Sequence, residues 1–141
     1  MSAEDNQVLV HRFFEELWNA RHLSLADELF SADHTYHDPS IPWAGPGPEG
    51  MKQVVSTYHQ AFPDARMNID DQFVAEDRVV TRWTAQGTHT ADLQGIAPTG
   101  KQIHVEGIWI HRLASGKIVE SWDVWDTVGM LQQLGVVPRM G

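Results

Sequence analysis

Two carboxylates near the C-terminus are the residues best placed to do chemistry. Asp123 and Asp126 lie within KIVESWDVWDTVGMLQQLG (117–135), among tryptophans and before an apolar run. If the first half of this stretch is a strand, alternation places Asp123 on one face with Val119 and Trp125. Apolar surroundings raise the pKa of a carboxyl group and make it a usable acid or base near neutral pH. Asp123 is therefore a candidate acid or base, and Asp126 is the predicted N-cap of a terminal helix. The alternative is that Asp123 is a solvated residue at a strand end.

Histidines supply the second set of candidates. His37 and His89 could donate hydrogen bonds to substrate carbonyl groups, and the alternative for each is a structural histidine bonded to backbone or to a carboxylate. The chain has eight histidines, which raises the question of a metal site. His34 and His37 are three residues apart on an extended segment and so face opposite ways. Neither an HExxH motif nor an i,i+4 histidine pair is present, so the sequence predicts no metal site.

Tryptophans and one arginine complete the candidate site. Alternation along 79–89 places Trp83 and His89 on one strand face and Arg82 on the other. Arg82 either points into a cavity or lies on the opposite sheet face in a subunit contact. Single tryptophans are more often core residues than ligand contacts, but several around one cavity would suit a flat polycyclic or aromatic substrate. The candidates are Trp18, Trp43, Trp83, Trp109 and Trp125.

Composition excludes several classes of protein. The 141 residues are expected to form one domain spanning 1–141. A net charge of −9 argues against binding to nucleic acid and to anionic membranes, since both require a basic surface. No apolar run approaches the roughly 18 residues that span a bilayer. Cysteine is absent, which excludes disulfides and thiolate chemistry. The N-terminus lacks a signal-peptide pattern, so a cytoplasmic location is the default expectation.

The order of predicted elements indicates an α+β domain. Helical spacing covers 4–21, a shorter helix is expected over 24–31 with Ser24 as N-cap and Asp27 completing a weak capping box, and Pro48 opens a third helix that ends before Pro63. Strand-like alternation follows over 65–77, 76–90, 102–113 and 117–125. Helices followed by antiparallel strands predict a sheet with the helices on one face.

Several motifs together resemble the SnoaL-like polyketide cyclases, or ester cyclases, of the NTF2-like superfamily. They are HDPS (37–40), GPEG (47–50), AFPDAR (61–66), VVTRWTAQGTHTADLQGIAPTGKQI (79–103), HRLASGKIVESWDVWD (111–126) and LQQLG (131–135). The resemblance covers nearly the whole chain. It implies a cone-like α+β fold, in which a curved antiparallel sheet packs against three or four helices around an apolar cavity.

The resemblance also implies a reaction. Characterised members of the family close a ring by intramolecular aldol condensation of a polyketide methyl ester, without metal or organic cofactor. An Asp on the last strand acts as acid and base, assisted by a His on the preceding strand. Asp123 matches the Asp, but Trp109 occupies the His position. An indole N–H can donate a hydrogen bond but cannot relay a proton. His111, two residues on and on the same face, is the candidate substitute; otherwise the chemistry differs.

Three functional hypotheses follow. The leading one is a cofactor-independent cyclase, a lyase or isomerase acting on a carbonyl-rich small molecule. The second is epoxide hydrolysis or isomerisation on the same fold, which uses an Asp–Arg–Asp constellation; Asp123 and Arg82 are candidates, but no second Asp is evident. The third is a non-catalytic small-molecule binding module. A homo-oligomer, either dimer or tetramer, is also expected, because Ile108 and Ile110 lie on the sheet face opposite Trp109.

Overall fold

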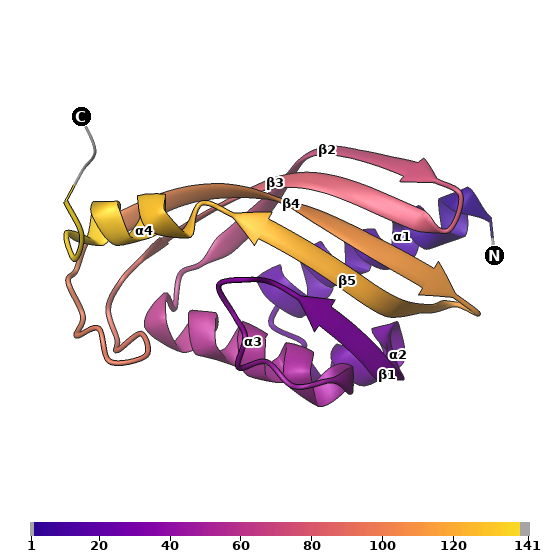
Figure 1. Cartoon of the computed structure of the whole chain (residues 1–141), viewed down its shortest axis with the longest axis horizontal. Coiled ribbons are helices and arrows are strands. Elements are labelled where there is room, and N and C mark those ends of the chain that lie inside the picture. The colour runs from indigo at the N-terminus through magenta and orange to yellow at the C-terminus, as the bar shows by residue number, and fades with distance from the viewer. Residues whose placement is uncertain (1, 139–141) are drawn as a thin grey trace.

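The computed structural model describes residues 2–138. The chain forms helices at both ends and a five-stranded sheet between them (Figure 1). In chain order the elements are α1 (Ala3–Arg12), the π-helix η1 (Phe13–Asn19), the 3₁₀-helix η2 (Leu23–Leu25), α2 (Ala26–Leu29), β1 (Phe30–His37), α3 (Gly47–Ala61), β2 (Arg66–Ala75), β3 (Arg78–Thr88), β4 (Gln102–Ala114), β5 (Lys117–Trp125) and α4 (Thr127–Leu134). No helix within residues 2–138 is long and apolar enough to cross a membrane.

The sheet is mixed rather than wholly antiparallel. Its strand order is β1-β5-β4-β3-β2, and β2 to β5 pair with their neighbours in antiparallel fashion. The edge strand β1 pairs with β5 in parallel, which corrects the expectation of an antiparallel sheet. A parallel pair needs a long connection, and α3 together with three strands provides it here. This pairing brings the end of β1 beside the end of β5.

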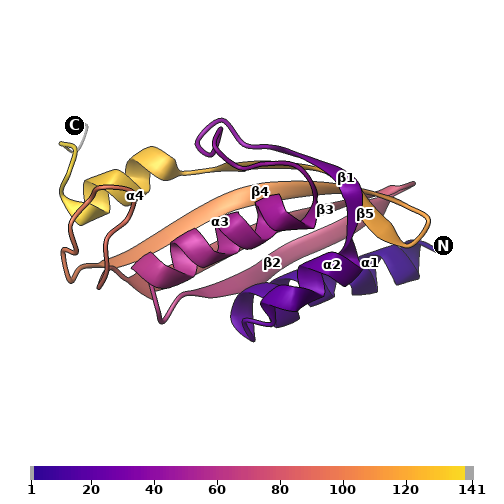
Figure 2. The same cartoon turned by 90° about the horizontal axis from the view of Figure 1, so that it is seen from below.

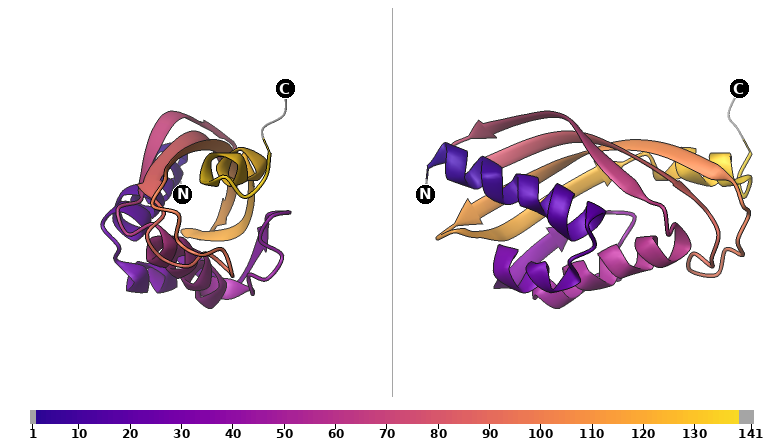
Figure 3. Two further views of the ribbon diagram at one scale, coloured as in Figure 1. Left: turned by 90° about the vertical axis from the view of Figure 1, so that its left-hand side faces the viewer. Right: turned by 180° about the vertical axis from the view of Figure 1, so that it is seen from behind.

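Curvature of the sheet creates an inner face that the helices cover. Seen along the long axis, the strands bend around the N-terminal helices and α3 (Figure 3). Viewed from below, α3 crosses the concave side of the sheet (Figure 2). Alternation follows this arrangement, because Val79, Thr81 and Trp83 of β3 are buried while Arg82 is exposed.

The predicted helix over 4–21 is present but changes its winding. Ser2 caps α1 in a capping box with Asp5, and the helix continues from Phe13 as a π-helix. This wider turn buries Phe13, Phe14, Leu17 and Trp18. Asn19, the last residue of the π-helix, bonds both the N–H and the C=O of Met67 at 2.8 Å. The π-helix is thus fixed to the edge strand β2.

The short helix predicted over 24–31 is only partly correct. Ser24 lies inside the 3₁₀-helix η2 instead of capping a helix, and no side chain caps either η2 or α2. The helix ends at Leu29 because Phe30, fully buried in the core, begins β1. By contrast, Pro48 does lie in the first turn of α3, and Asp126 caps α4 by accepting the Gly129 N–H at 2.8 Å.

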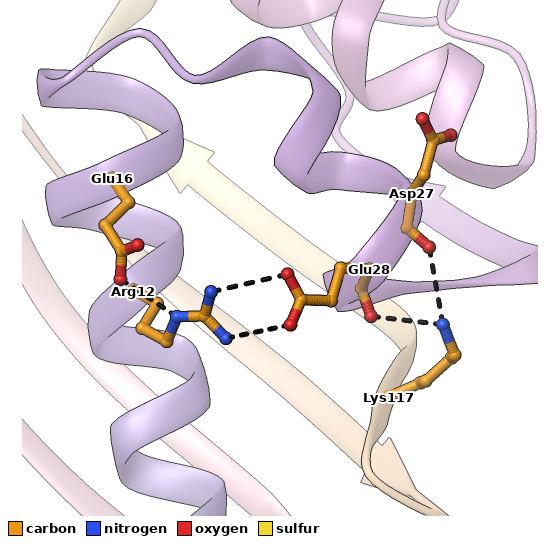
Figure 4. Close-up of polar contacts among 5 residues, drawn as sticks. All are labelled: Arg12, Glu16, Asp27, Glu28 and Lys117. Carbon is orange, nitrogen blue, oxygen red and sulfur yellow. Dashed lines mark hydrogen bonds and ion pairs between the residues drawn. The ribbon is translucent and has the colours of Figure 1, made fainter.

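Surface ion pairs join the N-terminal helices to one another, and hydrogen bonds from Lys117 join α2 to β5 (Figure 4). Arg12 donates to Glu16 at 2.9 Å and to both carboxylate oxygens of Glu28 at 3.4 Å. Lys117, at the start of β5, donates to the C=O groups of Asp27 and Glu28 at 3.3 and 3.1 Å. Exposed pairs of this kind each contribute about 0.2–1 kcal/mol. They fix the position of α2 more than they stabilise the fold.

Candidate active site

A cavity lies between the concave face of the sheet, the π-helix and α3. Its empty volume is about 650 Å³, including the part open to solvent. Most of the lining is aromatic or aliphatic, and the polar groups in it are few: Asn19, Tyr36, Tyr58, His59, Gln86 and Asp123. Over the part of the chain that the structure describes, the lining includes no lysine or arginine. A cavity with this lining suits a largely apolar, uncharged ligand.

Asp123 projects from β5 into this cavity. It lies directly across from Trp109 in the β4–β5 ladder and is 4% exposed. One carboxyl oxygen, Oδ1, accepts the Trp83 indole N–H at 3.2 Å. Burial raises the pKa of Asp123 well above its ordinary value, and the nearby Asp38 raises it further, while the Trp83 hydrogen bond acts in the opposite direction. Such a carboxyl group can exchange a proton near neutral pH.

A second buried carboxyl group, Asp38, lies behind the cavity wall. Its Oδ1 accepts the N–H and the hydroxyl of Ser40 at 2.8 and 2.7 Å. Its Oδ2 accepts the Tyr36 hydroxyl at 2.7 Å and the Trp125 indole N–H at 3.1 Å. Tyr36 itself lines the cavity, and its burial raises the pKa of the phenol, with Asp123 and Asp38 adding to the effect. The two carboxyl groups are therefore parts of one polar assembly.

Gly107 makes room for the two indoles that bond these carboxyl groups. It lies in β4 between Trp83 of β3 and Trp125 of β5. A Cβ at this position would lie 2.6 Å from the Trp125 Cβ and 2.7 Å from the Trp83 ring. Only glycine leaves space for the Trp83 and Trp125 side chains beside this position of β4, so Gly107 helps to position both indole N–H donors.

Trp109 forms the floor of the site, with His111 beyond it. The Trp109 ring stacks on Tyr36 with centroids 5.2 Å apart and on His111 with centroids 4.9 Å apart. His111 is fully buried outside the cavity lining, and neither of its ring nitrogens has a hydrogen-bond partner among the residues that the structure describes. Burial and the neighbouring His34 lower the pKa of His111 to about 3. The structure therefore does not place His111 where it could replace the family histidine as a proton relay.

Two other histidine candidates lie outside the cavity lining. His37 is exposed on the outer sheet face, where its Nε2 lies 2.8 Å from a Glu120 carboxylate oxygen. The cavity position expected for His37 is wrong, because alternation turns Tyr36 inward and His37 outward. His89 is buried, and its Nδ1 accepts the Thr99 N–H at 3.2 Å. It fastens the loop between β3 and β4 instead of facing a ligand.

The arginine and tryptophan candidates divide between the cavity and its surroundings. Arg82 is exposed on the outer face, which decides between the two positions considered for it. Trp43 is half-buried in the loop before α3, against the core but outside the lining. The tryptophans that do line the cavity are Trp18, Trp83, Trp109 and Trp125. Four of the five tryptophan candidates therefore lie at the cavity, and that they bind a substrate stays a prediction.

Sequence reasoning missed part of the lining. Tyr36 and Tyr58 face the cavity, as does His59, whose pKa burial lowers to about 4. Burial raises the pKa of the Tyr58 phenol. Strand alternation over 34–38 places Tyr36 and Asp38 on one face, and this is the signal in the sequence for both. The four-residue spacing of Val54 and Tyr58 is a weaker signal for the cavity face of α3.

Comparison with known proteins identifies the family. The family model described as SnoaL-like polyketide cyclase matches residues 8–134. The chain belongs to this family. No curated protein matches the chain. The fold is accordingly the NTF2-like cone of the SnoaL-like proteins, with a mixed five-stranded sheet.

Solved structures of SnoaL-like proteins superpose closely on this chain. A candidate polyketide cyclase from Acidithiobacillus ferrooxidans is 31% identical, with 96% of this chain and 99% of that chain covered and a TM-score of 0.83. IdmH, a candidate polyketide cyclase from Streptomyces antibioticus, is 32% identical over 92% and 98% of the two chains, with a TM-score of 0.78. AclR from Streptomyces galilaeus, named as a candidate hydroxylase, is 26% identical over 99% and 87%, with a TM-score of 0.85.

Proposed function

We propose that this SnoaL-like protein is a cofactor-independent acid/base enzyme for a carbonyl-rich small molecule, and specifically an intramolecular aldol-type polyketide cyclase. Family membership supports a small-molecule ligand. The observation that carries the proposal is Asp123, a carboxyl group 4% exposed at the wall of an apolar cavity, with its pKa raised by burial.

The cavity chemistry fits such a reaction. A proton between two carbonyl groups is already fairly acidic, so a carboxyl group with a raised pKa suffices to exchange it. Positioned acid/base catalysis of this kind contributes about 10²–10⁴-fold to the rate. The aromatic walls supplied by Trp18, Trp83 and Trp109 offer flat surfaces to a polycyclic or aromatic ligand.

Epoxide hydrolysis is less well supported. Asp38 supplies the second carboxyl group that the sequence did not reveal, since it lies close enough to raise the pKa of Asp123. The arginine of the required Asp–Arg–Asp constellation is lacking, because Arg82 is exposed on the outer sheet face. A cyclisation needs no arginine, so it remains the better fit to these residues.

The test compares wild type with Asp123→Asn on a panel of polyketide methyl esters and epoxides. Turnover of a cyclised ester should fall at least about 100-fold, while ligand binding, followed by tryptophan fluorescence, is retained. Asp126→Asn is the matched control, because it makes the same chemical change three residues away at an exposed helix cap, and asparagine also caps helices. Equal turnover in wild type and Asp123→Asn would remove Asp123 from the mechanism. Binding without turnover in every protein would favour a binding module.

We further propose that the protein is a homo-oligomer, a dimer or a tetramer, that associates through the outer face of the sheet. The support is a group of exposed apolar side chains on that face: Phe73 is 55% exposed, Ile108 48% and Val124 66%. Ile108 and Val124 are direct neighbours across β4 and β5. Clustered exposed apolar residues mark association surfaces. A cytoplasmic location stays a prediction from the sequence.

A further inference from the structure

We propose that Asp38 is a positioning residue that holds Asp123 in its acid form, so that Asp123 enters the reaction as a proton donor to an uncharged ligand. This inference rests on the proposed function and assigns a role to a residue outside the cavity lining. It also changes the order of the proton transfers, because Asp123 then gives a proton before it accepts one, whereas the sequence suggested a base.

The hydrogen bonds of Asp38 are those of an ionised carboxylate. Each of its two oxygens accepts two hydrogen bonds, from Ser40 twice and from Tyr36 and Trp125 once each. An ionised carboxylate only accepts, whereas a protonated one must donate from one oxygen. A proton on either oxygen of Asp38 would have to reverse the hydrogen bond from the Ser40 or the Tyr36 hydroxyl, because the Ser40 N–H and the Trp125 indole can only donate. All four bonds keep their observed direction only when Asp38 carries the negative charge.

The surroundings of Asp123 are the opposite. Within residues 2–138 its one hydrogen-bond donor is the Trp83 indole, and the cavity around it is lined mainly by apolar side chains. The parallel register of β1 and β5 pairs His37 with Trp122, so the next residues, Asp38 and Asp123, are neighbours on the inner face. Two adjacent buried carboxyl groups do not both ionise without a large cost. Since Asp38 has the donors, Asp123 is the member that keeps the proton.

No other group near Asp123 opposes this assignment. From β1 the titratable neighbour is Tyr36, and from α3 they are Tyr58 and His59. Both phenols have raised pKa values, and His59 has a pKa lowered to about 4, so all three are uncharged near neutral pH. Strands β3 and β4 contribute indoles, and His111 behind Trp109 is neutral as well, with a pKa of about 3. The π-helix contributes Trp18 and Asn19, and α4 contributes Met130, none of which is charged.

The hydrogen bond from Trp83 also indicates where the proton lies. The indole N–H occupies Oδ1 of Asp123, which leaves Oδ2 to carry the hydrogen. In a ring closure that starts from the enol tautomer of a 1,3-dicarbonyl ligand, the enol carbon forms the new carbon–carbon bond to a ketone carbon. The ketone oxygen takes the proton from Oδ2, and the enol O–H gives its proton to the lone pair of Oδ1 that the Trp83 N–H leaves free. One proton leaves Asp123 and one returns, so the acid is regenerated and no net charge develops in the cavity.

The experiment follows the carboxyl carbons of the intact protein, labelled with ¹³C-aspartate, by NMR from pH 3 to pH 9, with Asp123→Asn and Asp38→Asn providing the assignments. Asp38→Asn keeps the side-chain shape and removes the charge. We expect it to move the titration midpoint of Asp123 down by roughly one to two pH units. Ser40→Ala is the matched control, because it removes one donor from Asp38 but keeps the charge, so the Asp123 midpoint should stay high.

Two results would overturn the proposal. One is an unchanged Asp123 midpoint in Asp38→Asn. The other, measured in wild type and so independent of any variant that fails to fold, is an Asp123 carboxyl group that ionises at lower pH than Asp38. Because the NMR experiment measures protonation and not turnover, it tests the role of Asp38 even if no cyclised substrate is found. Conversely, loss of turnover in Asp123→Asn tests the proposed function alone.

Discussion

Replacing His111 with phenylalanine should make the protein less sensitive to acid. His111 is fully buried, stacked on Trp109 and 4.8 Å from the ring centroid of Phe13. Both ring nitrogens lack a hydrogen-bond partner. Phenylalanine preserves the flat ring and its contacts while removing these two polar atoms. The substitution therefore changes the protonation behaviour of the core with little change in its packing.

The magnitude follows from the pKa of His111. In the folded protein burial lowers it from 6.5 to about 3, whereas the unfolded chain retains the ordinary value. The contribution of neutral His111 to the free energy of unfolding is complete above pH 6.5. It is lost as the pH falls, because between pH 6.5 and 3 only the unfolded chain binds the proton. Each pH unit costs about 1.4 kcal/mol, so wild type should lose about 2 kcal/mol between pH 6.5 and 5 through this residue. His111→Phe should lack this loss, and near neutral pH it should be about 1–2 kcal/mol more stable.

Urea unfolding at pH 7, 6 and 5, followed by tryptophan fluorescence, measures the effect. The buried His34, with a pKa lowered to about 4, also lowers the free energy of unfolding as the pH falls. Asp123, with its raised pKa, increases the free energy of unfolding as the pH falls. Both are present in the two proteins and cancel in the difference. His11→Gln, at an exposed position of α1, is the control for removing a histidine. Parallel pH dependence in wild type and His111→Phe would refute the reasoning. Unchanged turnover in this variant would agree with the position of His111 outside the cavity.

Two further substitutions test the site and the outer face. Gly107→Ala forces a Cβ to within 2.7 Å of Trp83 and Trp125. We expect thermal unfolding to show a free energy of unfolding lower by about 1–3 kcal/mol, together with reduced turnover. Gly45→Ala, with open space around its Cβ, should change neither. Ile108→Lys places a charge on the exposed apolar face and should lower the mass measured by light scattering to that of a monomer. An unchanged mass would exclude association through this face, as would a monomeric wild type.

The fold was largely readable from the sequence because its signals are local. Pro48 and Asp126 mark helix starts through backbone chemistry that does not depend on tertiary context. Alternation separated Trp83 from Arg82 because one sheet face is buried and the other is not. The π-helix was not predictable, since a wide apolar stripe fits an α-helix equally well. The early end of the helix predicted over 24–31 has a tertiary cause, because the core requires Phe30 in a strand.

The candidate site was only half readable. Asp123 stood out because alternation and the family pattern agree on it. Asp38 did not, although it follows the inward-facing Tyr36, because its significance depends on the parallel pairing of β1 with β5. That pairing brings together side chains as distant in sequence as Asp38 and Trp125, which are 87 residues apart and bonded at 3.1 Å. Short-range periodicity contains no information on such a contact.

Trp109 connects these observations into one argument. The resemblance leads one to expect a histidine at this position, across from Asp123, to exchange protons with it. An indole cannot do so, and His111 is sealed behind it without a partner. A lone carboxylate in an apolar cavity would be costly, so burial itself favours the neutral acid at Asp123. The charge on Asp38, stabilised by donors from Tyr36, Ser40 and Trp125, strengthens this preference for the acid. A protein that lacks the histidine can thus retain proton transfer at Asp123 by starting from the acid instead of the base.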